Sequence, residues 1–116
     1  MSLVINQRKV SDVVILDLTG RLWILDLPLR DLMNALLSQD NHRFVLNVTG
    51  VDYIDSSGLG QLITIWTSIQ NRGGSMAILS PTKRVQRLFD ITRLNTVFPI
   101  VDQESEAIKL ASKASA

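Results

Sequence analysis

Short runs of apolar residues alternate along this chain with longer segments whose apolar residues recur at the 3.6-residue period of a helix. Alternation of this kind predicts an α/β fold, in which helical crossovers connect the parallel strands of one sheet. The chain has 116 residues, the usual length of a single domain. We therefore expect one domain over residues 1–111, with a mixed central sheet of about five strands and about four helices, and a frayed tail at residues 112–116.

Five runs rich in apolar and β-branched residues predict the strands. The first two predict an antiparallel hairpin, and Gly20 ends the second of them. The third is apolar on both alternating faces except at Asn47, which predicts a central strand. Asn47 is then either a hydrogen-bonded brace, which we favour, or a site residue. The last run contains Pro99, which cannot donate to a ladder and so predicts an edge strand. The runs cover residues 3–10, 13–19, 44–48, 76–79 and 96–101.

Four segments with helical periodicity predict the helices. The second of them is expected to end at Gly73-Gly74, where glycine can adopt the left-handed cap. The expected N-caps are Asp26, Asp55, Ser80 and Asp102. The residues expected to face the core are Leu29, Leu32, Met33, Leu36 and Leu37 in the first helix, Leu59, Leu62, Ile63, Trp66 and Ile69 in the second, Val85, Leu88 and Phe89 in the third, and Ala107, Ile108 and Ala111 in the fourth.

Charge and composition argue against several classes of function. The chain has 12 basic and 11 acidic side chains, and its net charge of +1 provides no broad basic surface for binding nucleic acid. The absence of cysteine excludes disulfides and thiolate metal sites and fits a reducing compartment. No apolar run approaches the ~20 residues that span a bilayer, and the first residues lack a signal peptide. We expect a cytoplasmic protein without membrane insertion.

Common catalytic and cofactor signatures are absent. The chain has neither a phosphate-binding glycine loop nor a nucleophile elbow, so nucleotide binding ranks low. The single histidine, His42, lies in a polar turn without clustered partners and is expected to be a solvated surface residue. Asp52 and Asp55 follow the central strand as in phospho-acceptor aspartate domains, but the first strand lacks the extra carboxylates that would hold Mg²⁺. We expect no cofactor or metal.

The segment at residues 52–60 is the strongest candidate site. Asp55 is placed to cap the following helix, which puts Ser56 and Ser57 in its first turn with free backbone N–H groups. Gly58 and Gly60 each cost the helix up to ~1 kcal/mol relative to alanine, which suggests that something approaches the backbone closely here. Taken alone, the segment is typical of ordinary helix capping.

In these residues the sequence resembles the STAS domain family, which comprises bacterial anti-sigma factor antagonists and related modules. The resemblance rests on residues 44–48, 51–60 and 84–92, which follow in order along nearly the whole chain. It implies a STAS-type α/β domain and a partner-switching protein. In its unphosphorylated form such a protein binds a cognate anti-sigma factor that is also a serine kinase, and thereby frees a sigma factor for transcription.

The resemblance also implies which residues act. The phosphorylated serine of the family directly follows the aspartate, which maps to Ser56, and a separate serine phosphatase restores the binding form. The protein is then a kinase substrate rather than an enzyme, and we expect a monomer or a weak homodimer. The expected surroundings of the phosphosite are Asp55, Ser57, Gly58, Gly60 and Asn47.

Two further groups are candidates for contact with a partner. An exposed aromatic and aliphatic cluster after the second strand would serve as an interface anchor, although a lid on the core is an equally open interpretation. A basic set on the third helix faces either an acidic partner or, more commonly, solvent. The first group comprises Trp23, Ile24, Leu25 and Asp26, together with Tyr53, and the second comprises Lys83, Arg84, Arg87 and Arg93.

Trp23 departs from the family pattern. Sigma-regulating relatives typically carry an aspartate at that place, and Asp26 is its candidate substitute here. The departure favours an alternative function somewhat: an accessory STAS module of a transport system, such as a lipid-trafficking ABC system or an anion transporter. Such a module acts by protein–protein contact and does not need a phosphorylated serine.

Overall fold

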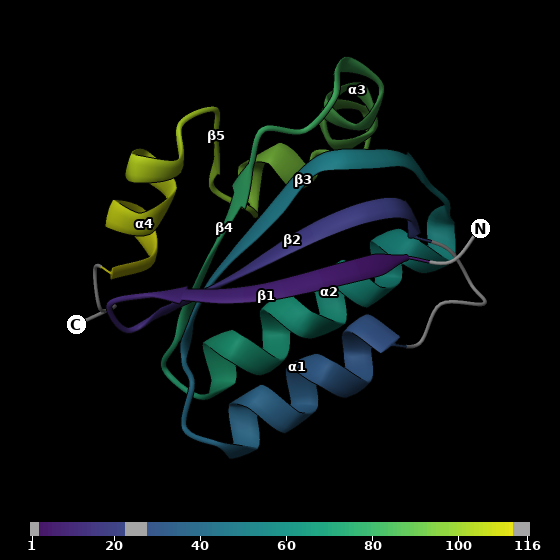
Figure 1. Cartoon of the computed structure of the whole chain (residues 1–116). Coiled ribbons are helices and arrows are strands. Elements are labelled where there is room, and N and C mark those ends of the chain that lie inside the picture. Colours follow the sequence, from purple (N-terminus) through teal and green to yellow (C-terminus); the bar gives the residue numbers. More distant parts are fainter. Residues whose placement is uncertain (1–2, 23–27, 113–116) are drawn as a thin grey trace.

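The computed structural model describes residues 3–22 and 28–112, and within them the chain forms one five-stranded mixed sheet with helices on both faces (Figure 1). This architecture confirms the predicted fold class. In chain order the elements are β1 (Val4–Val10), β2 (Val13–Leu22), α1 (Pro28–Ser38), β3 (Arg43–Ile54), α2 (Ser56–Asn71), β4 (Ser75–Leu79), α3 (Lys83–Ile91), the 3₁₀ helix η1 (Leu94–Thr96), β5 (Ile100–Val101) and α4 (Glu104–Ser112).

The strands follow one another across the sheet in the order β1-β2-β3-β4-β5. β1 pairs antiparallel with β2, as the predicted hairpin requires, and the remaining neighbours pair parallel. β3 therefore lies at the centre and β5 at an edge, which confirms both predictions. Because β2 to β5 run in one direction, the carboxyl ends of β2 and β3 meet at one edge of the sheet, where α2 begins.

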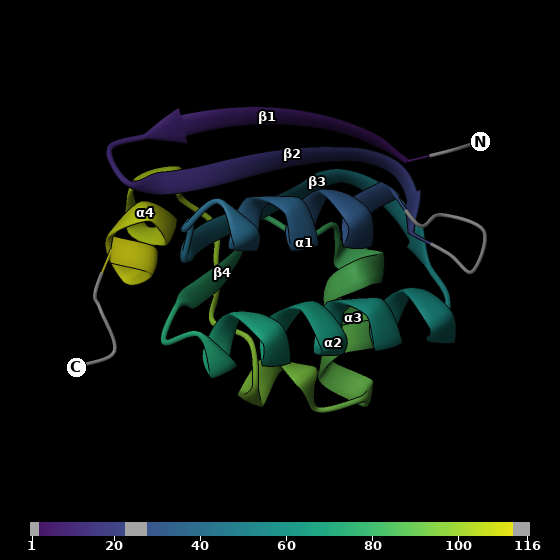
Figure 2. The ribbon, with the colours of Figure 1, turned by 90° about the horizontal axis from the view of Figure 1, so that it is seen from below.

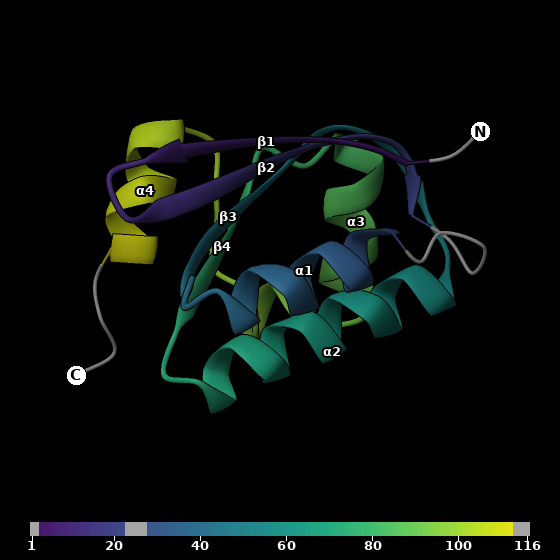
Figure 3. The same ribbon diagram turned by 60° about the horizontal axis from the view of Figure 1, so that its bottom comes forward.

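The core is divided by the sheet into two unequal parts. α1 and α2 lie together against one face (Figures 2 and 3), and buried Val85 and Phe89 of α3 join the same large cluster. α4 alone packs on the opposite face, where Ala107 and Ala111 meet the small cluster that includes Val45. This second face also carries polar side chains, among them Asp17 and Asn47, which are joined by a hydrogen bond.

Both long strands extend beyond their predicted ends. β2 passes through Gly20 and ends at Leu22, and β3 continues six residues past Val48 to Ile54. The register between them shifts near Asp17 and again after Gly20, where φ is 112°. Such irregularities interrupt the two-residue alternation while keeping the strands paired, so periodicity alone placed the ends too early.

The inner face of α2 differs by one position from the prediction. Ile65 is buried, whereas Ile63 is 42 % exposed and Trp66 is only partly buried at the margin of the core. Leu59, Leu62 and Ile69 are buried as predicted, and Gly73 has the expected positive φ of 73° beyond the helix end. The buried spacing of three, three and four residues follows the helical period, and Ile63 lies outside that stripe.

The predicted caps of the last two helices are wrong. Thr82 caps α3, its hydroxyl accepting a hydrogen bond from the backbone N–H of Val85 at 3.2 Å. Ser80 instead has a φ of 52° and donates its hydroxyl to the carbonyl of Asp102 at 3.0 Å. An N-cap residue is normally extended, whereas Ser80 lies in the left-handed region, so α3 begins only at Lys83, after the extended Thr82.

The segment between α3 and α4 is less extended than predicted. Residues 94–96 form η1, so only Ile100 and Val101 remain as strand. Phe98 is buried, with its ring edge-on to the rings of Trp66 and Phe89 at centroid distances of 6.4 and 6.0 Å. α4 begins at Glu104, one residue too late for a cap at Asp102, and Arg93 lies beyond the end of α3. The expected cap Asp26 lies outside the described residues.

Candidate phosphorylation and partner-binding site

The start of α2 is fixed by hydrogen bonds at the carboxyl edge of the sheet. Asp55 is extended, with φ −95° and ψ −179°, and its carboxylate accepts a hydrogen bond from the N–H of Gly58 at 2.7 Å. This confirms the predicted N-cap. The backbone N–H of Asp55 donates to the carbonyl of Leu22 at 3.2 Å, which joins the helix start to the end of β2. The start of α2 is therefore held in place at the ends of β2 and β3.

Ser56 is that first residue, and it is exposed, whereas its neighbour Ser57 is half-buried. The first N–H groups of a helix have no partner inside it, and they carry the positive end of the helix dipole. A phosphate on Ser56 would lie at this positive end and directly beside the carboxylate of Asp55. The structure thus brings together Ser56, Asp55 and Ser57 as the sequence predicts.

The two glycines of this turn have different environments. A Cβ on Gly58 would lie 2.2 Å from the carbonyl oxygen of Leu22, so the close approach at Gly58 is made by the chain's own β2. The close approach expected at these glycines is therefore present at Gly58 and absent at Gly60. Gly60 is exposed, and a Cβ there would meet nothing within 4 Å, so it keeps the surface low beside Ser56.

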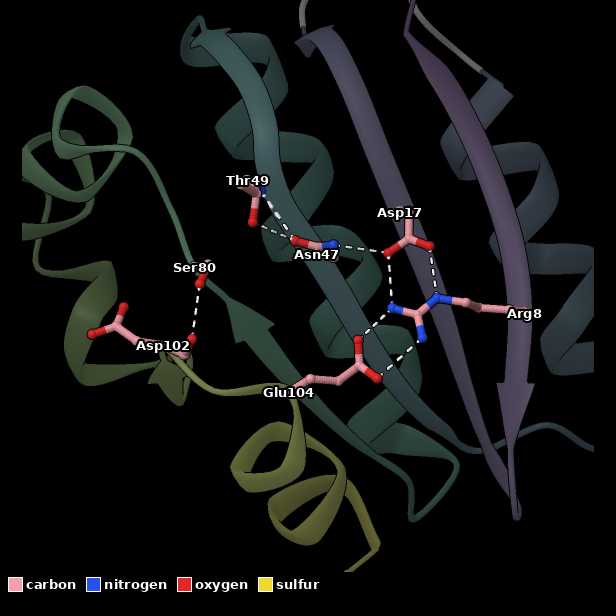
Figure 4. A network of polar contacts seen from close by, with 7 residues as sticks. All are labelled: Arg8, Asp17, Asn47, Thr49, Ser80, Asp102 and Glu104. Atoms are coloured by element: carbon pink, nitrogen blue, oxygen red, sulfur yellow. Dashed lines mark hydrogen bonds and ion pairs between the residues drawn. The ribbon is translucent and has the colours of Figure 1, made fainter.

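Asn47 is not part of this site. It lies seven residues before the end of β3, roughly 20 Å away at the usual rise of a strand. Its amide donates to Asp17 at 2.8 Å, and its carbonyl oxygen accepts from the hydroxyl of Thr49 at 2.7 Å (Figure 4). The structure therefore supports the role of a brace that links two strands and does not place Asn47 near Ser56.

The brace belongs to a larger network centred on Arg8, which the sequence analysis missed. The guanidinium of Arg8 contacts Asp17 at 2.7 Å and Glu104 at 2.5 Å, and so links β1, β2 and α4 (Figure 4). The hydrogen bond from Arg8 lowers the pKa of Asp17 and that of Glu104 below their ordinary values, while desolvation acts in the opposite direction. Arg8 and Glu104 are 96 residues apart, so no local pattern could reveal the pair.

Tyr53 lies three residues before Ser56 and is 40 % exposed. It pairs across the strands with Arg21, whose guanidinium carbon lies 6.0 Å from the centre of the tyrosine ring. These two residues, with Asp52 and Arg84, line a pocket of about 210 Å³. The predicted partner-binding residue Tyr53 is therefore partly exposed near the end of β3, the strand that leads into the candidate phosphosite. Sequence reasoning singled out Arg84 only as part of a basic set, and it missed Arg21.

Four of the predicted partner-binding residues, Trp23, Ile24, Leu25 and Asp26, lie outside the described residues. His42 is half-buried rather than solvated, and its Nδ1 is buried with no hydrogen-bond partner among the described residues. Within residues 3–22 and 28–112 no three His, Cys, Asp or Glu side chains are grouped so that they could hold a metal ion. No helix in these ranges is both long and apolar enough to cross a membrane.

The sequence matches the model of a known family over most of its length. The model of the STAS domain matches residues 4–107, and the chain belongs to this family. A Thermotoga neapolitana protein, provisionally named an anti-sigma factor antagonist, is 34% identical over 102 residues, which cover 86% of this chain and 90% of that protein. The anti-sigma F factor antagonist of Paenibacillus polymyxa is 30% identical over 110 residues, covering 93% and 94%.

One solved structure with the same fold is that of a phosphorylated protein. The Bacillus cell fate determinant SpoIIAA, in its phosphorylated form, has a TM-score of 0.71 and 20% sequence identity to this chain. The match covers 91% of this chain and 97% of that one. At this identity the likeness establishes the fold shared by the two proteins.

Proposed function

We propose that this protein is an anti-sigma factor antagonist that binds a cognate anti-sigma factor with serine kinase activity and is released when Ser56 is phosphorylated. The observation that carries the proposal is the exposed Ser56 at the first position of α2, directly after the capping Asp55. The protein would act in the cytoplasm as a monomer or weak homodimer and as a substrate rather than an enzyme. A serine phosphatase would restore its binding form.

Similarity to named relatives supports the proposal. The Paenibacillus relative is named for antagonism of an anti-sigma factor, and its similarity extends over 93% of this chain. SpoIIAA, which has the same fold, has been solved in a phosphorylated form. An exposed serine in the first turn of α2 is consistent with the same chemistry here.

The local electrostatics explain how a phosphate would act. Phosphorylation adds about −1.5 to −2 charges at pH 7. The N-terminus of α2 offsets this charge in the free protein by ~0.3–1 kcal/mol. In a complex, the same charge would be buried beside the carboxylate of Asp55, where both repulsion and desolvation oppose binding. Phosphorylation is therefore expected to weaken docking.

The proposal is tested by incubating the purified protein with ATP and the anti-sigma factor kinase from the same genome, chosen by gene neighbourhood. We expect mass spectrometry to find phosphate on Ser56. Ser57→Ala is the matched control, because Ser57 is the adjacent serine and is half-buried, so this variant should be labelled normally. Absence of label on Ser56, together with equal binding by Ser56→Ala and Ser56→Asp, would contradict the proposal.

One sequence feature supports a second candidate. Trp23 stands where sigma-regulating relatives typically carry an aspartate, which is consistent with an accessory STAS module of a transport system. In that case the chain would bind a transporter subunit through protein contacts whether or not Ser56 is modified. Neighbouring permease and ATPase genes, with binding to their products that is insensitive to Ser56→Asp, would favour this second function.

A further inference from the structure

The pocket beside Tyr53 combines groups from two parts of the chain. Arg21 and Tyr53 come from paired positions near the ends of β2 and β3, and Arg84 is the second residue of α3. A second hollow of about 140 Å³ continues along Tyr53 and Arg84 to Val85 and Leu88 of α3. Together they form a groove between the end of β3 and α3, with a polar end and an apolar end.

The charges in this groove are unbalanced. Neither Arg21 nor Arg84 forms an ion pair with a carboxylate of the described residues, although Arg8 and Arg43 both do. Asp52 supplies one negative charge to the pocket wall against the two guanidinium groups. Lys83 and Arg87 of α3 line a separate hollow together with Asp90 and Asp102. Arg21 and Arg84 both line this pocket beside Tyr53, and each guanidinium carries a planar fork of N–H donors that can bind a carboxylate.

We propose that this groove, lined by Arg21, Tyr53, Arg84 and Leu88, receives an acidic segment of the partner protein, with one Asp or Glu side chain entering the pocket between the two arginines. The carboxylate would accept hydrogen bonds from the guanidinium groups, and the apolar end would hold a neighbouring aliphatic side chain. This inference rests on the proposed function, because it assigns the chemistry by which the partner is recognised.

The size and composition of the pocket favour a protein side chain over a free ligand. Sites for small molecules usually measure ~300–1,000 Å³, so a pocket of about 210 Å³ suits one side chain better than a whole cofactor. Tyrosine and arginine are enriched at the residues that contribute most to protein interfaces. Tyr53 is three residues from Ser56, roughly 10 Å at the usual rise of a strand, so a partner segment seated at Tyr53 would lie close enough to sense a charge on Ser56.

The short distance along the chain between Tyr53 and Ser56 gives a phosphate on Ser56 a second effect. A phosphoserine at the start of α2 would repel an acidic segment that approaches Arg21 and Arg84. The same negative charge would therefore oppose docking even if the turn itself were not buried in the complex. Recognition by charge also predicts that docking weakens as salt increases, because exposed charges are screened within about 10 Å at 0.1 M ionic strength.

The test uses the isotopically labelled full chain and two matched peptides, acetyl-Gly-Glu-Glu-Asp-Glu-Glu-Gly-amide and its Gln/Asn counterpart. We expect the acidic peptide alone to shift the amide resonances of Arg21, Tyr53 and Arg84. Arg84→Glu should weaken peptide binding by about tenfold or more. Lys109→Glu is the matched control, because it makes the same charge change at an exposed position on α4 and should leave binding unchanged.

A second arm measures binding of the anti-sigma factor to the same variants with Ser56 intact. Weaker binding by Arg84→Glu but not by Lys109→Glu supports the inference. Equal shifts with both peptides, or normal anti-sigma factor binding by Arg84→Glu, overturn the inference and leave the proposed function standing. If the unmodified chain binds the acidic peptide at the groove but no anti-sigma factor, the proposed function fails while the groove stands as an acidic-peptide site.

Discussion

Two glycines in the first turns of α2 occupy opposite environments, and this yields a matched pair of variants. Gly58→Ala would place a methyl group 2.2 Å from the carbonyl oxygen of Leu22, which requires the helix or β2 to move. We expect a loss of ~1–3 kcal/mol in the free energy of unfolding. Gly60→Ala meets nothing within 4 Å and should stabilise the protein by ~0.5–1 kcal/mol. Urea denaturation measures both, and similar effects at the two positions would contradict this account.

Single residues of the site could be predicted where the signal was local. The cap at Asp55 and the exposed Ser56 follow from a short polar segment before a helix, and the structure confirms the cap. Asn47 was placed near Ser56 by the family resemblance, but its position in the middle of β3 separates the two. The groove residue Arg21 has no local signal, because its pairing with Tyr53 depends on strand register.

At the scale of elements, the fourth helix is tied to the sheet by charge as well as by packing. Arg8 lowers the pKa of Asp17 and of Glu104, so between the lowered values and the ordinary values of 3.8 and 4.5 the unfolded chain binds more protons than the folded chain. The network therefore contributes stability above the ordinary pKa values, and this stability is lost as the pH falls through the lowered values. Denaturation measured from pH 7 to pH 3 should show the loss.

Glu104→Gln tests this assignment. It should reduce the acid-dependent loss of stability, at a cost of less than ~1 kcal/mol at pH 7, because Arg8 and Glu104 are both well exposed to solvent. Glu106→Gln on the same helix is the control, because Glu106 forms no ion pair among the described residues. An equal change in the acid slope for both variants would show that the Arg8 network is not its source.

The segment between α3 and α4 is held by a buried aromatic ring as well as by the short pairing of β5 with β4. Phe98 is 1% exposed and packs edge-on against Trp66 and Phe89. Phe98→Ala should cost ~3–5 kcal/mol in the free energy of unfolding, as measured by chemical denaturation. Val97→Ala is the neighbouring control, since Val97 is 37% exposed. A loss below ~1 kcal/mol for Phe98→Ala would contradict its place in the core.

The bounds of elements were predicted less well than their order, for physical reasons. Register shifts near Asp17 and Gly20 broke the alternation within strands that remain paired. The run at residues 96–101 has the composition of a strand, but tertiary packing of Phe98 made its first half a turn. Local propensity is a weak determinant wherever a large side chain can be buried by another conformation.

At the scale of the whole molecule, the mixed pairing of the sheet, its central β3 and its edge strand β5 followed from the sequence pattern. Each helix between two strands implies a crossover, and crossovers imply parallel neighbours, which the structure shows for β2 to β5. The network of Arg8 and the groove at Arg84 could not be predicted in this way. Both depend on side chains that the fold brings together from distant parts of the chain.

The switch is expected to act on binding and to leave the fold intact. Ser56 is exposed, so Ser56→Asp should change the free energy of unfolding by no more than ~0.5 kcal/mol. Thermal denaturation of Ser56→Asp and of Ser56→Ala measures this directly. A loss of ~2 kcal/mol or more in Ser56→Asp alone would indicate that negative charge acts by loosening α2.

The most direct test compares the unmodified chain with the same chain carrying phosphate on Ser56, by calorimetric titration against the anti-sigma factor. We expect the unmodified chain to bind and phosphorylation to weaken binding by at least about tenfold, since a charge is added at a buried contact. Equal affinity of the two forms, with both fully folded, would contradict the claim that Ser56 is the switch.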